Sequence, residues 1–174
     1  MTDAPEQSGR TPVVRDDDWF DALFTAHVGA LHRYFVRRVG ASEADDLTAD
    51  VLATAWRRRE TIEDGFELPW LYRTAGFVLA NHRRRHGAVP SDDLNVLEGV
   101  SQDDPAETAA EAARARAALA TLSERDREIL MLVAWEGVPR DQLAQVLGTS
   151  VGGADAALSR ARARLRAAWD EVAA

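Results

Sequence analysis

Two helical stretches of this sequence carry side chains suited to binding nucleic acid. The later one has an arginine at every second position from 160 to 166, and arginine commonly contacts DNA phosphates. The earlier one combines aromatic rings, which can stack on unpaired bases for about 1–3 kcal/mol each, with arginine and amide groups. Its members are Trp70, Tyr72, Arg73, Phe77, Asn81, Arg83 and Arg84. The alternative for Trp70 and Phe77 is burial in a hydrophobic core.

The other reactive residue types form no catalytic or metal-binding pattern. His82 and His86 have a spacing found in zinc sites, but the three arginines between them disfavour a cation. Four acids on an earlier helix could bind a cation, but an acidic surface for a basic partner explains them better. These acids are Glu43, Asp45, Asp46 and Asp50. We expect no enzymatic activity, no cofactor, no metal and no small-molecule substrate.

A helix-turn-helix is predicted near the C-terminus, where it would position the later basic stretch. Ser123 followed by Asp126 predicts the start of a helix. Pro139 suits the first position of a second, short helix, which Gly148 closes. Ser150 can cap a third helix, and this helix would enter a DNA major groove. The alternative is an ordinary helical hairpin that binds nothing.

Apolar residues repeat at steps of three and four throughout most of the chain, which predicts helices and no strands. Before residue 87 we expect three helices. The first lies at about 18–39, the second runs from a cap at Ser42 to the arginines at 57–59, and the third lies at about 68–86. An alanine-rich helix over 106–119 precedes the helix-turn-helix. The predicted fold is all-α, with two small helical domains joined by a flexible acidic linker. The expected divisions are a disordered tail at 1–17, domains at 18–86 and 106–174, and the linker at 87–105.

Composition excludes several classes of protein. The chain has 174 residues and no cysteine, so it forms no disulfide. Its longest apolar run, Ile129 to Trp135, is far shorter than the ~18 residues of a membrane span, and the N-terminus lacks a signal segment. We therefore expect a soluble, cytoplasmic protein. The net charge is −8, with the excess acid mainly in the tail and the linker, so that both domains are nearly neutral.

Three segments together resemble a bacterial sigma factor of the extracytoplasmic-function (ECF) type, a small member of the sigma-70 family. The segment 45–56 is similar to the helix with which the family docks on RNA polymerase. The segment 70–85 is similar to the part that melts and reads the minus-ten promoter element. The segment 122–162 resembles the domain that reads the minus-thirty-five element. The resemblance extends over residues 18–169 in the family's order.

This resemblance implies promoter recognition by RNA polymerase, with the core enzyme, promoter DNA and an anti-sigma protein as partners. The residues implied for polymerase binding are Asp45, Asp46, Leu47, Asp50 and Val51. Those implied for the minus-ten element are Trp70, Arg73, Asn81, Arg83 and Arg84. Those implied for the upstream element are Arg140, Ser150, Gly152, Asp155, Ser159, Arg160 and Arg162.

The chain departs from the family pattern at three places. Pro139 stands where the family usually has a Ser or Thr cap. The loop 63–67 is acidic here, whereas in the family the corresponding loop helps to capture a flipped base. Asp155 stands where a basic residue is usual.

Gly152 and Gly153 offer no side chain to a base. Asp155 either selects one base by accepting a hydrogen bond, as from a cytosine amine, or it repels phosphates. We expect weak upstream binding, in which Arg160 and Arg162 contact only the DNA backbone.

Two other functions are compatible with the same sequence. One is a stand-alone regulator that reads DNA with the helix-turn-helix alone, as a dimer on paired half-sites. The other is a sigma-like decoy that binds polymerase or an anti-sigma protein without reading DNA. The acidic loop and Asp155 favour the decoy.

Overall fold

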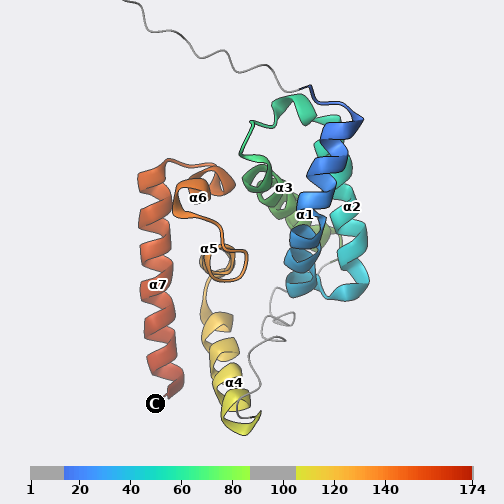
Figure 1. The fold of residues 1–174 in the computed structure, drawn as a ribbon. Helices are drawn as coiled ribbons and strands as arrows, with labels where there is room; N and C mark the ends of the chain where they lie inside the picture. The colour runs from blue at the N-terminus through green and yellow to red at the C-terminus, as the bar shows by residue number, and fades with distance from the viewer. Residues whose placement is uncertain (1–13, 87–104, 174) are drawn as a thin grey trace, which may run out of the picture.

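The computed structural model describes residues 14–86 and 105–173, and every element in these ranges is helical. An N-terminal lobe consists of α1 (Asp17–Val39), α2 (Ala41–Arg57), the short 3-10 helix η1 (Arg59–Thr61) and α3 (Glu67–His86). A C-terminal lobe consists of α4 (Pro105–Thr121), α5 (Glu124–Ala134), α6 (Arg140–Leu147) and α7 (Val151–Ala173). Figure 1 shows the two lobes side by side, and they confirm the all-α prediction. Within the described residues, no helix is long and apolar enough to cross a membrane.

Capping residues explain where the N-terminal helices begin and end. The Asp16 carboxylate accepts a hydrogen bond from the Trp19 amide (3.1 Å) and so starts α1. Gly40 ends α1 in a backbone conformation with φ 83°, which suits glycine. Gly40 also occupies the N-cap position of α2. That helix therefore begins one residue before the cap that Ser42 was expected to provide.

The last residues of the expected tail are part of the N-terminal lobe. Arg15 forms an ion pair with Asp64 (2.6 Å), and the Arg59 Nε donates to the carbonyl of Arg15 (2.8 Å). The Arg15 guanidinium also lies 4.8 Å from the centre of the Trp19 ring. Residues 14–17 are thus structured, whereas the rest of the tail lies outside the described residues. The predicted linker also lies outside them, except for its last residue, which begins α4.

The two lobes share one connected hydrophobic core. Buried residues of α1, α2 and α3 belong to the same cluster as those of α5, α6 and α7. Helix α3 packs against α6, and Figure 1 shows α5 and α6 on the side of the C-terminal lobe that faces α1 and α3. The sequence predicted two helical domains, and the structure adds an interface between them.

Candidate nucleic-acid interface

A hollow of about 570 Å³ lies along α3, next to the end of α2. Cationic, amide and aromatic side chains lie side by side in it, which is the chemistry that binds unpaired bases. The lining residues are Thr54, Arg58, Trp70, Arg73, Thr74, Phe77, Val78 and Asn81. Phe77 is 66% exposed, so its burial in the core is excluded, and Trp70 is half-buried. The hollow therefore brings together three of the residues predicted for the minus-ten element.

Two residues of this hollow come from α2 and the turn after it, and the sequence did not reveal them. Thr54 donates its hydroxyl to the Asp50 carbonyl (2.8 Å) and accepts a hydrogen bond from Arg57 (2.9 Å). Arg58 belongs to a basic run at the end of α2, where the helix dipole alone would favour arginine. The direction in which Arg58 points depends on how α2 packs against α3, which no spacing within α2 encodes.

The basic end of α3 divides into paired and exposed residues. Arg83 forms an ion pair with Glu124 of α5, whereas Asn81 and Arg84 are exposed. His82 lies 2.5 Å from the Glu43 carboxylate, and its ring stacks on His86 with 4.3 Å between centroids. Asn81 and Arg84 are accordingly open to a ligand, while Arg83 also contacts the other lobe.

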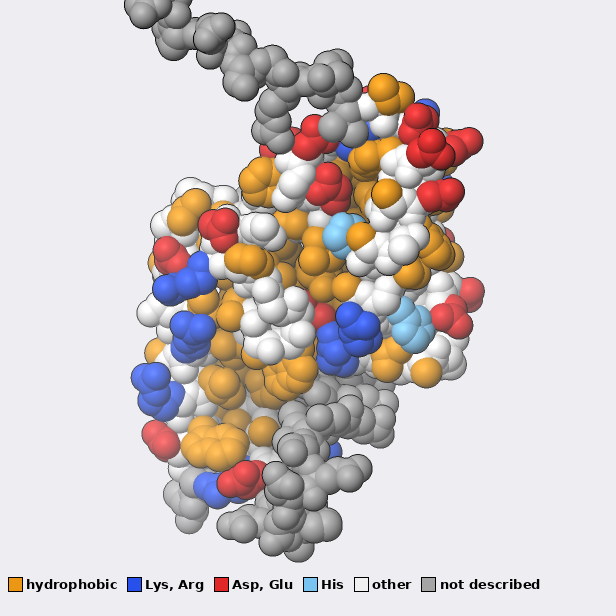
Figure 2. All heavy atoms as spheres, in the orientation of Figure 1, with side chains coloured by type: hydrophobic (Ala, Val, Ile, Leu, Met, Phe, Trp, Pro, Cys, Tyr) orange, Lys and Arg blue, Asp and Glu red, His pale blue; other side chains and the backbone are white. Residues whose placement is uncertain are grey.

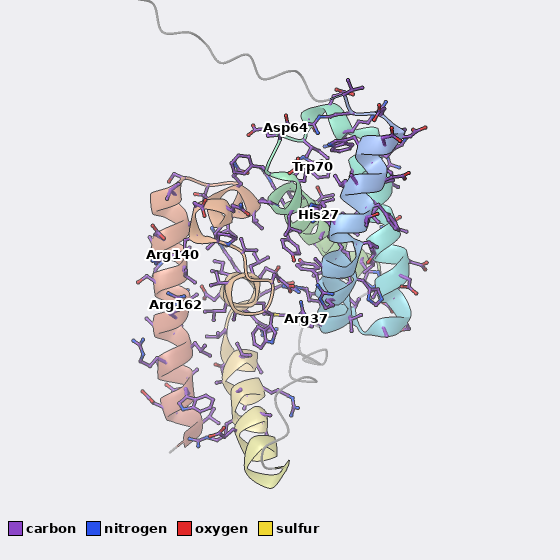
Figure 3. The ribbon with its side chains drawn as sticks, viewed as in Figure 1. His27, Arg37, Asp64, Trp70, Arg140 and Arg162 are labelled. Atoms are coloured by element: carbon purple, nitrogen blue, oxygen red, sulfur yellow. The ribbon has the colours of Figure 1, made fainter. Side chains whose placement is uncertain are left out.

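A second hollow of about 350 Å³ adjoins the first and includes the acidic loop. Its lining residues are Thr61, Glu63, Phe66, Trp70, Arg73 and Gln145. Figure 3 shows Asp64 on the loop above Trp70. Because Asp64 pairs with Arg15 (2.6 Å), part of the loop's negative charge is already compensated. Gln145 belongs to α6, so the C-terminal lobe forms one wall of this hollow.

The acids of α2 form an exposed face. Asp45, Asp46 and Asp50 point to solvent, and Asp45 lies 3.2 Å from the ring of His32. Leu47 and Val51, also predicted for polymerase binding, are 6% and 0% exposed and lie in the core. Of the residues predicted for polymerase binding, only the three acids are accessible to a partner. Leu47 and Val51 instead hold α2 in place by packing in the core.

The predicted helix-turn-helix is present as α6 and α7. Pro139 is the N-cap rather than the first helical residue, so α6 begins one residue later than expected, at Arg140. Gly148 ends α6 in the left-handed conformation (φ 62°). Ser150 caps α7, because its hydroxyl accepts a hydrogen bond from the Gly153 amide (3.1 Å). The hydroxyl of Ser150 therefore helps to position α7, the helix predicted to enter the DNA major groove and called the recognition helix below.

The exposed face of the helix-turn-helix mixes cations with an acid. The Nε of Arg140 lies 3.5 Å from the Asp155 carboxylate, which ties α6 to the recognition helix. Ser159, Arg160 and Arg162 are exposed, and Figures 2 and 3 show arginines along the α7 side of the molecule. Gly152 is exposed, with open space where a side chain would be.

Arg164, in the same basic stretch, has a structural partner in α5. Its guanidinium donates to Asp126 (2.6 Å), whose carboxylate also accepts from the Ser123 hydroxyl (2.7 Å). The Ser123 hydrogen bond, together with Arg164, holds the pKa of Asp126 below its usual range, although burial opposes this. Arg164 thus links α7 to α5, which leaves Arg160 and Arg162 as the predicted arginines of α7 that are free to face DNA phosphates.

Together the fold and these surfaces define a two-lobed helical protein with a helix-turn-helix. Residues 23–89 match the family model for Sigma-70 region 2, and residues 112–165 match the model for Sigma-70, region 4. The chain belongs to the sigma-70 family of RNA polymerase sigma factors and is of the ECF type. The match over 23–89 speaks against a stand-alone helix-turn-helix regulator.

Relatives of similar length are named as RNA polymerase sigma factors. The RNA polymerase sigma factor CnrH of Cupriavidus metallidurans is 31% identical over 142 residues, which are 74% of each protein. The ECF RNA polymerase sigma factor EcfG of Rhodopseudomonas palustris is 30% identical over 161 residues, covering 90% of this chain and 85% of EcfG. This chain is accordingly a sigma factor, which directs RNA polymerase to promoters in transcription initiation.

Solved structures share the fold. The sigma factor RpoE of Bartonella quintana, in complex with the anti-sigma factor NepR, superposes with a TM-score of 0.64 at 22% identity. The superposition covers 88% of this chain and 98% of RpoE. CnrH in complex with the cytosolic domain of CnrY gives a TM-score of 0.61 at 24% identity, over 90% of this chain and 91% of CnrH.

Proposed function

We propose that the chain performs its sigma-factor role with three surfaces. The acidic face of α2 binds the RNA polymerase core enzyme, and the hollow along α3 takes unpaired bases of the minus-ten element. The helix-turn-helix contacts upstream duplex DNA mainly through phosphates. The chain contributes binding rather than catalysis, and it acts in the cytoplasm, where RNA polymerase works.

The hollow along α3 is the observation that carries this proposal. The Trp70 ring can stack on a base, and Arg73 supplies a cation for the adjacent phosphate. Asn81 offers both a donor and an acceptor, so it can pair with the edge of a base. Phe77, which is 66% exposed, adds a second ring that can stack on a neighbouring base. Arg84, exposed at the end of the same helix, extends the phosphate contact.

The upstream surface is suited to phosphate contact more than to base recognition. Arg140, Arg160 and Arg162 are exposed cations, whereas Gly152 offers no side chain at the start of the recognition helix. Asp155 can only accept hydrogen bonds, as from a cytosine amine, and it already lies beside Arg140. We infer that this lobe adds affinity and register, and that most sequence discrimination resides in α3.

An anti-sigma protein is the expected inhibitor. The structure of RpoE that resembles this chain contains the anti-sigma factor NepR, and that of CnrH contains the cytosolic domain of CnrY. We propose that an anti-sigma protein binds this chain too and prevents its use by polymerase.

Transcription from purified components tests the function directly. Core polymerase should transcribe specific fragments of a genomic library only when the chain is added. Asp50→Arg should abolish this effect and co-purification with core, because like charges at an interface cost several kcal/mol. Asp21→Arg is the matched control, since Asp21 is an exposed acid of α1 outside the proposed surface. If the wild-type chain binds core yet supports transcription of no fragment, it is a decoy.

A further inference from the structure

A small network of contacts joins the start of α1 to the turn that precedes α3. The Arg15 Nη2 donates to the Asp64 carboxylate (2.6 Å), and the Arg59 Nε donates to the backbone carbonyl of Arg15 (2.8 Å). Only 9% of the Arg15 side chain is exposed, against 35% of the Asp64 side chain. We refer to Arg15, Arg59 and Asp64 as the N-terminal clamp.

Two tryptophan rings hold the cations of this clamp in place. The Arg15 guanidinium lies 4.8 Å from the centre of the Trp19 ring in α1, and the Arg59 guanidinium lies 4.2 Å from that of the Trp56 ring in α2. Arg59 also donates to the Trp56 carbonyl (2.9 Å). Because a cation is attracted to the face of an aromatic ring, the clamp is fixed to α1 and α2 independently of the turn that it holds.

The segment held by the clamp is a tight turn over residues 63–66. The Phe66 amide donates to the Glu63 carbonyl (3.1 Å), and Gly65 has a φ of 82°, as is typical of the third residue of a type II turn. Asp64 is the second residue of this turn, and its carboxylate reaches Arg15 from the tip. The clamp therefore fixes the tip of the turn from outside, in addition to the turn's own hydrogen bond.

The two ends of this turn line the hollow of about 350 Å³ that contains Trp70. The lining residues Glu63 and Phe66 come from the turn, and the Phe66 carbonyl accepts a hydrogen bond from the Trp70 amide (3.0 Å). A movement of the turn therefore displaces the Phe66 ring relative to α3 and alters the shape of the hollow. Asp64 is not one of the lining residues, so it can act on a bound base only through the turn.

The simplest role for Arg15 would be to neutralise Asp64, since an acid near DNA repels phosphates. The burial of Arg15 indicates a second role. An exposed ion pair contributes little, because two mobile side chains must be held in one geometry. Arg15 is already immobilised against Trp19, and its pair with Asp64 joins segments 49 residues apart. Such a contact can hold the turn as well as offset its charge.

We propose that Arg15 is a positioning residue for base recognition, which acts through Asp64 to hold the turn 63–66 and keep Phe66 next to Trp70. This inference rests on the proposed function, because it takes the surroundings of Trp70 as the place where an unpaired base binds. Arg15 lies before residues 23–89, the segment that matches the Sigma-70 region 2 model. The residues that shape this hollow thus extend beyond the matched segment.

Amide hydrogen exchange of the full-length chain, followed by NMR, tests the hold on the turn. Arg15→Ala and Asp64→Ala should each raise the exchange rate of the Phe66 amide roughly fivefold, as expected for the loss of one ion pair with a part-exposed partner. Amides in the middle of α1 should exchange as in the wild type. Arg33→Ala and Asp21→Ala, the same changes at exposed positions of α1, should leave the exchange of Phe66 unaltered.

DNA binding by the polymerase holoenzyme tests the consequence. The probe is a forked duplex, single-stranded over the minus-ten region, made from a genomic fragment that the wild-type chain transcribes with core polymerase. Arg15→Ala and Asp64→Ala should each weaken binding roughly fivefold, and the double variant should bind no more weakly than either, because both changes remove the same contact. Charge neutralisation alone predicts that Asp64→Ala binds at least as tightly as wild type.

A scan with abasic nucleotides separates positioning from a general loss of stability. One base of the single-stranded region is removed at a time. At the position that fills the hollow beside Trp70, base removal should weaken binding by the wild type at least about fivefold, the least expected for a stacked base. The same removal should weaken binding by Arg15→Ala much less. At the other positions both proteins should lose affinity by the same factor.

Three results would overturn the inference. They are unchanged exchange of the Phe66 amide in Arg15→Ala, undiminished DNA binding by Asp64→Ala, and equal abasic losses in wild type and Arg15→Ala at every position. If the wild-type chain supports transcription of no fragment, the proposed function fails and the role in base recognition fails with it. Raised exchange of the Phe66 amide would still show that Arg15 holds the turn.

Discussion

The two lobes differ in where they place acidic side chains relative to their proposed binding surfaces. In the N-terminal lobe the exposed acids of α2 are not among the residues that line the cationic and aromatic hollow along α3. In the C-terminal lobe Asp155 lies on the recognition helix itself, 3.5 Å from Arg140. Under the proposed function, the N-terminal lobe offers its acids to polymerase and its hollow to DNA, whereas the C-terminal lobe partly neutralises its own DNA surface.

The lobes also differ in what they offer to a base. Helix α3 presents the rings of Trp70 and Phe77 and the amide of Asn81. The first turn of α7 presents Gly152 and Gly153, with Val151 exposed beside them. The difference supports the proposal that recognition of promoter sequence is concentrated in the N-terminal lobe. Four experiments test this contrast between the lobes.

The largest expected effect concerns Tyr72 of the N-terminal lobe, whose ionisation is opposed first by burial and then by the charge of Glu136 in the C-terminal lobe. Burial, together with Glu136, raises the pKa of Tyr72 from 10.0 to about 12, although nearby arginines oppose this shift. The folded protein thus keeps Tyr72 neutral where the unfolded chain ionises. Through Tyr72 alone, the free energy of unfolding should fall by up to about 3 kcal/mol as the pH rises from about 10 to about 12.

Urea unfolding at a series of pH values measures this loss. Because the sequence contains no lysine and no cysteine, its two tyrosines are the side chains that ionise in this range. Tyr72→Phe should therefore remove much of the alkaline loss of stability, while Tyr34 accounts for the remainder. An unchanged pH profile in Tyr72→Phe would show that the folded protein does not raise the pKa of Tyr72.

The second prediction tests where bases are read. Trp70→Ala should reduce open-complex formation by the loss of one stacked base, about 1–3 kcal/mol, whereas Arg160→Ala should reduce it less. Permanganate footprints of melted DNA at matched polymerase occupancy measure both. Phe24→Ala, an exposed ring of α1, is the control. Equal losses of open-complex formation for Trp70→Ala and Arg160→Ala would contradict the proposal that bases are recognised mainly by the N-terminal lobe.

The third prediction concerns Asp155. Asp155→Ala frees Arg140 from its partner and removes a charge that repels phosphate, so affinity for duplex DNA should rise by up to about 1 kcal/mol, as expected for an exposed pair. The gain should be the same for promoter and scrambled duplexes in a titration of the polymerase holoenzyme. A loss confined to the promoter duplex would instead show that Asp155 reads a base.

The smallest expected effect is a difference in stability between alanine substitutions at two adjacent glycines of the recognition helix. Gly152→Ala meets open space and should stabilise α7 by up to about 1 kcal/mol. Gly153→Ala should gain less, because its methyl group would lie 2.6 Å from the Thr149 hydroxyl and 3.2 Å from that of Ser150, the helix cap. Thermal unfolding of the two variants compares them. Equal gains in stability would mean that the turn before α7 moves to accommodate the methyl group at no energetic cost.

Much of the fold was predictable from local patterns in the sequence. The caps at Ser123 and Ser150 and the glycine at 148 act within a few residues, so they mark the helix-turn-helix without any tertiary information. The set of residues along α3 follows from helical periodicity in the same way. Trp70, Arg73 and Asn81 do line one hollow.

The interface between the lobes was not predictable in this way. Arg37 and Arg38 lie in the last turn of α1, where the helix dipole favours arginine in any case. Their ion-pair partners, Glu128 and Glu136, follow 90 to 99 residues later, and no periodic pattern links positions so far apart. Arg58 and Thr54 escaped notice for a related reason, because their place beside α3 depends on how two helices pack.

The distance in sequence between Arg38 and Glu136 also has a consequence for the chain during its synthesis. Glu136 is added 98 residues after Arg38, which at about 5–20 residues per second takes roughly 5–20 s. For that interval the emerging α1–α3 segment has its arginines but lacks the carboxylates that cover them. Each newly made molecule therefore passes through a period on the ribosome in which these arginines lack their partners, and this period ends only after Glu136 has been added.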